Sequence, residues 1–243
     1  FTVYKNKFYF IADDGEHGRE LWVSDGTSEG TKIFMDINPD GDSNPSDFTI
    51  FKDKIYFTAK DGEHGEEIWV SDGTQIGTSL LKDIAPEGSS NPWINTIFDN
   101  KLFFTIYKSY DPRIEELWIS DGTTEGTEQI KNIKPDNLDV DRFIRHFTIF
   151  NNTLYFITRN YDGDAFLYKS DGTEKGTEPV MEIAPENDSY INNLIIYDNN
   201  LYFEADDGIH GIELWMSDGT ESGTKMVKDI NSDGSSEPWQ FIV

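Results

Sequence analysis

The chain has 243 residues, a formal net charge of −26 at neutral pH and no cysteine. The lack of cysteine excludes a disulfide framework and thiolate metal sites, and the acidic charge makes DNA, RNA and anionic membranes poor partners. No apolar run approaches the roughly 20 residues of a membrane-spanning helix, so direct membrane insertion is not expected. Aromatic residues make up 14% of the sequence and recur at fixed places, so we interpret them as core residues.

One motif, a short apolar stretch followed by Ser-Asp-Gly-Thr, occurs five times at nearly constant spacing. The first copy begins at Glu20, and the later copies begin at Glu67, Glu116, Phe166 and Glu213, which gives steps of 47, 49, 50 and 47 residues. A period of this length indicates that one supersecondary unit is repeated. No linker separates the copies, so we expect a single domain of five similar units.

The first unit contains four short apolar stretches, at residues 1–4, 8–12, 20–24 and 31–37. Their β-branched and aromatic residues, bounded by Asn, Asp and Gly, predict four strands. A polar turn separates the first two stretches, and Asn or Asp at such a turn adopts the positive φ that a tight hairpin requires. Helical periodicity is missing throughout. We place the five units at about residues 1–47, 48–94, 95–146, 147–192 and 193–240.

Four antiparallel strands in each repeat at this period are typical of a β-propeller blade. We therefore predict an all-β fold, a five-bladed β-propeller with four antiparallel strands per blade. The tail at residues 241–243 repeats the apolar start at residues 1–3. Two interpretations of the tail are open: it is a closing strand for the first blade, which we favour, or it is the start of a sixth unit.

The pattern Glu-Leu-Trp-x-x-Asp-Gly-Thr at residues 20–27, 116–123 and 213–220 resembles the ELWxxDGT repeat of large secreted bacterial proteins. The second copy departs from it at Ile68, and the fourth at Phe166 and Tyr168. The resemblance covers essentially the whole chain. It implies a propeller module that is secreted, extracellular or on the bacterial cell surface, often within a larger adhesin-type protein, and it implies no catalytic residue.

A Gly-rich acidic loop precedes the motif in units one, two and five and holds three of the four histidines. His17, His64 and His210 each stand three residues before a glutamate, namely Glu20, Glu67 and Glu213. A histidine near carboxylates can contact a ligand, bind a metal or act in acid–base chemistry. The spacing is not that of a zinc protease, and we favour a structural role in which each histidine hydrogen-bonds within its own blade, with ligand contact as the alternative.

The connection after the fourth strand is expected on the same face as these loops. In unit one it contains Asp40, Asp42 and Asn44, and oxygen-rich loops of this kind suit Ca²⁺. Asn91 occupies the corresponding place in unit two. Trp93 and Trp239 are expected on loops just before the next strand, where an aromatic ring beside polar groups can stack on a sugar. The structural alternative is a Pro-Trp pair that caps the junction between blades.

We therefore predict a non-enzymatic ligand-binding module of the lectin or adhesin kind, with carbohydrate ranked above a cell-surface protein or peptide as the partner. Calcium is the only cofactor predicted, with Asp40, Asp42 and Asn44 as its ligands. Two alternatives remain open: a glycan-cleaving enzyme on the same scaffold, and a protein-binding or spacer module of a large adhesin. The candidate ligand-binding residues are His17, Glu20, His64, Glu67, His210, Glu213, Trp93, Trp239, Asn44 and Asn91.

Overall fold

The structure, a computed structural model, describes residues 1–110, 113–131, 142–160, 165–183, 190–239 and 241. Within these ranges all the regular structure is β-strand, and the strands form five four-stranded antiparallel sheets. This arrangement confirms the predicted all-β class and the predicted four strands per repeat. The described part of the chain contains no helix long and apolar enough to cross a membrane. The predicted closing strand at 241–243 lies mostly outside the described residues.

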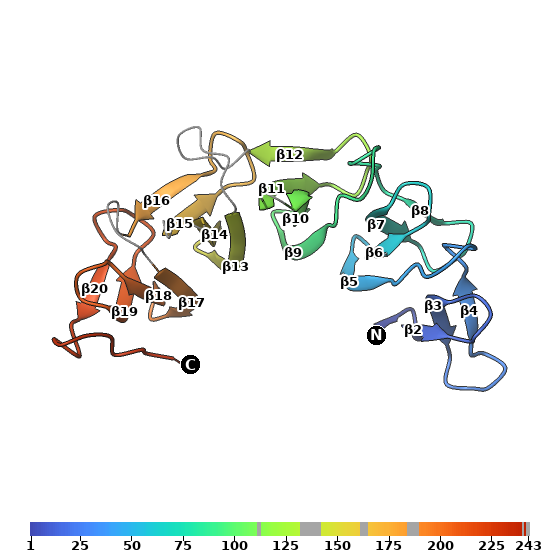
Figure 1. The fold of residues 1–243 in the computed structure, drawn as a ribbon, viewed down its shortest axis with the longest axis horizontal. Coiled ribbons are helices and arrows are strands. Elements are labelled where there is room, and N and C mark those ends of the chain that lie inside the picture. Colours follow the sequence, from blue (N-terminus) through green and yellow to red (C-terminus); the bar gives the residue numbers. More distant parts are fainter. Residues whose placement is uncertain (111–112, 132–141, 161–164, 184–189, 240, 242–243) are drawn as a thin grey trace. The chain divides into compact units, whose positions relative to one another are not determined.

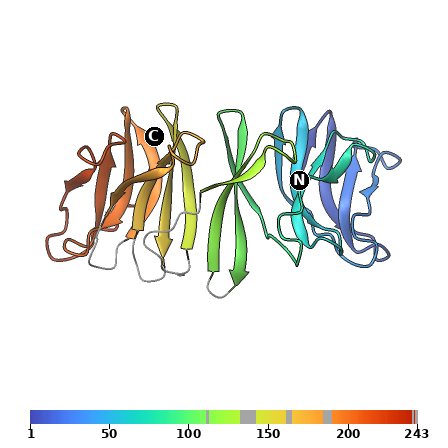
Figure 2. The same cartoon turned by 90° about the horizontal axis from the view of Figure 1, so that it is seen from above.

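Each sheet is built from four strands that are consecutive in the sequence (Figures 1 and 2). The first sheet contains β1 (Thr2–Tyr4), β2 (Lys7–Asp13), β3 (Arg19–Ser24) and β4 (Lys32–Met35). The second contains β5 (Ser46–Phe51), β6 (Lys54–Lys60), β7 (Glu66–Ser71) and β8 (Thr78–Leu80). The third contains β9 (Trp93–Phe98), β10 (Lys101–Tyr110), β11 (Arg113–Ser120) and β12 (Thr127–Lys131). The fourth contains β13 (Arg142–Phe150), β14 (Thr153–Asn160), β15 (Ala165–Ser170) and β16 (Glu178–Glu182). The fifth contains β17 (Tyr190–Tyr197), β18 (Asn200–Asp206), β19 (Ile212–Ser217) and β20 (Lys225–Lys228).

The chain divides into two compact units, Phe1–Lys108 with Trp118–Gln129, and Ser109–Leu117 with Ile130–Val243. In the first unit, Trp69 and Phe57 of the second sheet are buried against Tyr9 and Leu21 of the first sheet. In the second unit, Trp215 of the fifth sheet joins a core with apolar residues of the fourth sheet. Since burying one such side chain contributes roughly 1.5–3 kcal/mol, packing between successive sheets is the main source of stability within each unit.

Tight hairpins join the first two strands of every sheet, as predicted. In the first sheet, Lys5 and Asn6 have φ values of 47° and 61°. The two turn residues of the other four sheets also have positive φ, which is the conformation of the two-residue turns that match the twist of paired strands. Asn and Asp fill most of these positions because they tolerate this region best.

The first strand of the second, third, fourth and fifth sheets begins before the repeat boundary predicted from the sequence. β5, β9, β13 and β17 begin at Ser46, Trp93, Arg142 and Tyr190. Each is interrupted by a shift in register, and in three of them a residue with positive φ lies at the shift: Asp47, His146 and Asn193. A β-bulge of this kind lets the strand continue while it re-aims one side chain.

The Ser-Asp-Gly-Thr element is a turn whose side chains bond to one another. Asp72 Oδ1 accepts hydrogen bonds from the backbone N–H and the hydroxyl of Thr74, at 2.9 and 2.7 Å. Thr74 Oγ1 accepts from the N–H of Gly77 at 3.0 Å, and Ser71 Oγ lies 2.7 Å from Thr78 Oγ1. The same bonds recur in the other four sheets. The motif is therefore used to fix the turn, as its structural interpretation expects.

The second glycine of this turn has a steric role that substitution can test. A Cβ atom built on Gly77 would lie 2.2 Å from the Asp72 carboxylate, whereas one on Gly88 meets nothing within 4 Å. We expect Gly77→Ala to displace Asp72 and to lower the free energy of unfolding by about 1–3 kcal/mol, because the bonds to Thr74 are lost. Gly88→Ala is expected to change it by less than about 0.5 kcal/mol. Denaturant midpoints measure both effects, and equal midpoints would contradict the steric explanation.

Candidate functional site

The three repeated histidines are tied to their own loops. His17 Nδ1 lies 2.8 Å from Asp14 Oδ2, and the backbone N–H of His17 donates to Asp14 Oδ1 at 2.9 Å. His64 and His210 bind their aspartates in the same way, at 2.7 and 2.8 Å. These contacts are the hydrogen bonds within the blade that the structural interpretation of the histidines expects. Each imidazole is nonetheless partly exposed on its loop.

A second aspartate lies near each of these histidines. The pKa of His17, His64 and His210 is raised, first by the hydrogen bond to the loop aspartate and more weakly by the charge of a second aspartate. Those second aspartates are Asp36, Asp83 and Asp229, and each has a buried Oδ1 without a hydrogen-bond partner among the described residues. The repeated arrangement therefore favours the imidazolium form.

The histidines should titrate in two groups. We expect His17, His64 and His210 to titrate above 6.5 and His146 below it, because desolvation lowers the pKa of His146. The three histidines whose pKa is raised stabilise the fold fully below pH 6.5, which is their pKa in the unfolded chain. This stabilisation is lost as the pH rises through their pKa in the folded state. NMR titration of the imidazole protons, with His146→Gln for assignment, measures the values. A common pKa for all four would contradict this assignment.

The three predicted glutamates have buried carboxylates that hold the loop after the fourth strand. Glu20 accepts from the backbone N–H of Ile37 at 2.8 Å and from the N–H and hydroxyl of Ser43 at 2.9 and 2.5 Å. Glu67 binds Ser90 and Glu213 binds Ser236 in the same manner. All three side chains are 0% exposed. The structure thus places Glu20, Glu67 and Glu213 out of reach of a ligand on the surface, where sequence reasoning expected them to make contacts.

Burial gives Glu67 a pH-dependent role in stability. Desolvation raises the pKa of Glu67 to about 7, against the opposing hydrogen bonds from Ser90, while its unfolded value is 4.5. The stabilisation from its protonated form is complete below pH 4.5 and is lost as pH rises through 7.

We therefore expect the difference in unfolding free energy between wild type and Glu67→Gln to fall between pH 4.5 and 7 and then to level off. Gln cannot ionise, so the variant lacks the loss of stability that the wild type suffers as Glu67 ionises. Urea unfolding at several pH values tests this. Glu63→Gln is the control, because it makes the same charge change on an exposed side chain of the preceding loop. A difference that is independent of pH would contradict the buried-acid assignment.

The predicted calcium ligands are only partly free. Asp42 Oδ1 accepts from the backbone N–H of Arg19 at 2.9 Å, a position that Ser89 Oγ and Ser235 Oγ occupy in the second and fifth sheets. Asp40 and Asn44 are exposed. The described residues contain no group of three or more His, Cys, Asp or Glu side chains arranged to hold a metal. The calcium site at Asp40, Asp42 and Asn44 stays a prediction.

Asn44 and Asn91 share a backbone role. Both have a φ of 45°, and Glu237 takes the same conformation, at 46°, in the fifth sheet. The backbone N–H of Asn44 donates to the carbonyl of Arg19 at 3.1 Å, and that of Glu237 donates to the carbonyl of Ile212 at 3.2 Å. Asn tolerates this left-handed backbone conformation better than most residues. The backbone geometry therefore explains why Asn occurs at this position without any ligand contact by its side chain.

The two predicted tryptophans are exposed but differ in setting. Trp93 is the first residue of β9 and pairs with Thr105, so its expected position on a loop is wrong. The reason is that the β9–β10 pairing continues past a register shift. Trp239 does lie outside any strand, and 69% of its surface is exposed. Trp93 belongs to the first compact unit and Trp239 to the second.

Trp239 lines a cavity of about 260 Å³ in the second unit, together with Tyr190, Glu204, Ile212 and Glu237. The Glu204 side chain is almost fully buried, and its Oε1 accepts from Asn192 Nδ2 at 3.0 Å and Asn193 Nδ2 at 2.7 Å. Sequence reasoning missed Glu204, Tyr190 and Glu237. A signal for Glu204 existed, since the other repeats carry Ile or Thr at its position in the second strand.

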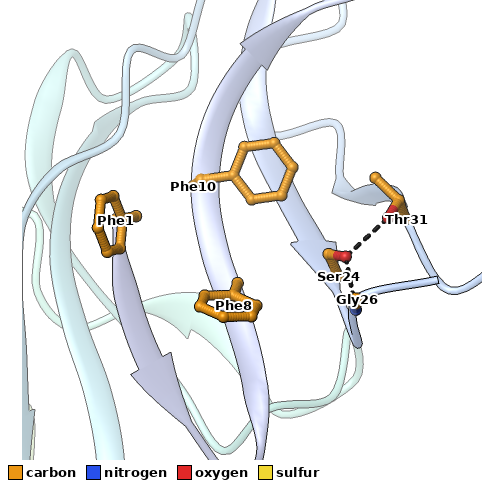
Figure 3. Close-up of a pocket in the computed structure, with 6 residues that line it drawn as sticks. All are labelled: Phe1, Phe8, Phe10, Ser24, Gly26 and Thr31. Atoms are coloured by element: carbon orange, nitrogen blue, oxygen red, sulfur yellow. Dashed lines mark hydrogen bonds between the residues drawn. The ribbon is translucent and has the colours of Figure 1, made fainter. Parts of the chain in front are cut away.

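A larger cavity, of about 450 Å³, lies on the first sheet (Figure 3). Its wall is formed by Phe1, Phe8 and Phe10, and the nearby hydroxyls of Ser24 and Thr31 bind each other at 2.7 Å. In the second sheet the positions of Phe8 and Phe10 are occupied by Ile55 and Phe57, which pack against the first sheet. This cavity therefore has the character of a sheet-packing surface, because it lacks the free polar groups of a specific ligand site.

Comparison with known proteins identifies the fold class. No family model and no curated protein matches the chain. A puromycin hydrolase structure matches with a TM-score of 0.55 and 9% identity, over 93% of this chain and 38% of that one. Oligopeptidase B from Leishmania major matches with a TM-score of 0.55 and 13% identity, over 92% of this chain and 33% of that one. A structure of a prolyl endopeptidase matches with a TM-score of 0.53 and 11% identity, over 93% of this chain and 35% of that one.

At sequence identities of 9–13%, the likeness to these structures shows the fold and nothing about function. The five four-stranded sheets and the likeness to propeller-containing proteins define a β-propeller fold with five blades. The chain spans only 33–38% of the length of these structures, so the likeness says nothing about its activity. The resemblance to ELWxxDGT proteins stays a prediction.

Proposed function

We propose that the chain is a non-enzymatic binding module of a secreted or cell-surface protein and that it binds carbohydrate in the cavity beside Trp239. One observation carries the proposal: an indole with 69% of its surface exposed stands beside two carboxylates and a phenol in one cavity. The flat apolar face of the indole suits the C–H face of a sugar ring, and the carboxylates suit its hydroxyl groups.

The position of Glu204 supports this function. Asn192, Asn193 and Tyr190 all bind its Oε1, so the carboxylate is held in one orientation before a ligand arrives. A fixed acceptor loses little conformational entropy on binding, which is a general requirement for affinity in a small site. Glu237 lies on the same cavity and provides a second acceptor.

A glycan-cleaving enzyme is the second candidate, because Glu204 and Glu237 line one cavity and glycoside hydrolysis uses two carboxylates. The three hydrogen bonds on Glu204 Oε1 suit a fixed hydrogen-bond acceptor better than a group that must deliver a proton. Binding without cleavage is therefore the function that the geometry supports best.

Trp239→Ala tests the proposal. We expect the wild-type chain to bind glycans on an array and the variant to bind them about tenfold more weakly or worse, because the stacking surface is lost. Tyr197→Ala is the matched control, since Tyr197 is also an exposed aromatic residue of the second unit and does not line the cavity. An array without any bound glycan, or equal binding by Trp239→Ala, would refute carbohydrate recognition here. Release of cleaved sugar from a bound glycan would favour the enzyme.

A further inference from the structure

A third cavity, of about 230 Å³, lies between the fourth and fifth sheets and differs from the rest of this acidic chain in its charge. It is entirely within the second compact unit. Two arginines and two aromatic rings form much of its wall, which β13, β14 and β17 provide. The residues that the argument uses are Phe143, Arg145, His146, Arg159, Tyr190 and Asn192.

Arg145 is already neutralised. Its Nη1 donates to Glu115 Oε2 at 2.7 Å and its Nη2 donates to Glu115 Oε1 at 2.8 Å, so the pair is bidentate. The Glu115 side chain is almost fully buried, and it also accepts from the backbone N–H of Ile144. Because a buried carboxylate needs such a partner, Arg145 fixes the wall of the cavity and does not supply a free charge.

Arg159 is the cation that remains. Its side chain is exposed, and no ion pair joins it to a carboxylate among the described residues. Its guanidinium carbon lies 5.6 Å from the centre of the Tyr190 ring, and Arg159 is paired with Phe143 across the sheet. Stacking on an aromatic face orients a guanidinium while leaving the N–H groups at its edge able to bind an anion.

His146 adds a polar side chain without adding charge at neutral pH. It has a φ of 58° at the bulge in β13, between Arg145 and Thr148. Desolvation lowers its pKa, against a side-chain hydrogen bond with Asn192. Among the described residues that line this cavity, Arg159 therefore carries the one positive charge without an ion-pair partner, and a single guanidinium matches an anion of charge −1 better than a dianion. The Glu204 carboxylate does not line the cavity and accepts from the Tyr190 hydroxyl and the Asn192 amide of its wall.

We propose that this cavity binds the carboxylate of a uronic acid unit, with Arg159 as its charged anchor. The planar guanidinium can bind a planar carboxylate through two parallel hydrogen bonds. Tyr190 lines both this cavity and the cavity of Trp239, so a glycan held at Trp239 can present a neighbouring acidic sugar to Arg159. The inference that the ligand is a sugar rests on the proposed function, whereas the anion site depends on Arg159 alone.

The test compares two sugars that differ in one group. Methyl β-D-glucuronide and methyl β-D-glucoside are titrated into the wild-type chain and followed by NMR chemical shifts. We expect the glucuronide to bind about tenfold more tightly, since the charge-assisted bonds to Arg159 are present only with the carboxylate. Arg159→Gln is expected to abolish this preference and to leave glucoside binding unchanged.

Lys169→Gln is the control, because it removes one positive charge from the same sheet at a residue that pairs with Glu178 and does not line the cavity. Arg159 is exposed, and an unchanged denaturant midpoint will show that Arg159→Gln folds. Equal affinity of wild type for the two sugars, or a preference that survives Arg159→Gln, would overturn the proposal. Glucose 6-sulfate binding as tightly as the glucuronide would overturn the carboxylate assignment.

The two proposals can fail separately. If Trp239→Ala leaves both sugars bound as in wild type while Arg159→Gln removes the preference, the anion site stands and the sugar site at Trp239 is wrong. If Trp239→Ala weakens both sugars and Arg159→Gln changes neither, carbohydrate recognition stands and the anion site is wrong.

Discussion

Packing of aromatic side chains from one sheet against the next is the interaction on which the rest of this structure depends. Trp69 and Trp215 are both nearly buried in such interfaces, and each is paired across its own sheet with a buried phenylalanine, Phe57 or Phe203. A four-stranded sheet with apolar residues on both faces is unstable alone in water, because each face must be removed from solvent. Each sheet therefore presents an apolar face that packs against the apolar face of the next sheet, and these paired faces form the core within each compact unit.

Polar groups of the repeat are used mainly to hold loops and turns on this apolar framework. The Asp-Gly-Thr turns satisfy their own backbone N–H groups, and the buried carboxylates of Glu20, Glu67 and Glu213 bind the connection that follows the fourth strand. A buried carboxylate is stable only when several donors surround it. The most repeated residues are thus explained by folding, and the binding site that we propose uses positions where one repeat differs from the others.

The two cavities at Tyr190 illustrate this division. Glu204 replaces the Ile or Thr of the other repeats and is fixed by two asparagines. Arg159 stacks on the ring of the same Tyr190, and Arg145 is held by Glu115. An acidic and a basic side chain thereby meet at one residue: the Glu204 carboxylate accepts from the Tyr190 hydroxyl, and the Arg159 guanidinium lies over the Tyr190 ring.

The amino-acid sequence by itself determined the local structure: five repeats, four strands in each, tight hairpins at Asn and Asp, and turns at Ser-Asp-Gly-Thr. These features follow from alternation, turn chemistry and repeat length, which act over a few residues. Only the tertiary structure showed that Glu67 is buried under Ser90, that Trp93 belongs to a strand, and that Glu115 neutralises Arg145 across 30 residues. Burial and partners depend on segments that are far apart in the sequence, so residue type alone could not separate a carboxylate that anchors a loop from one that faces a ligand.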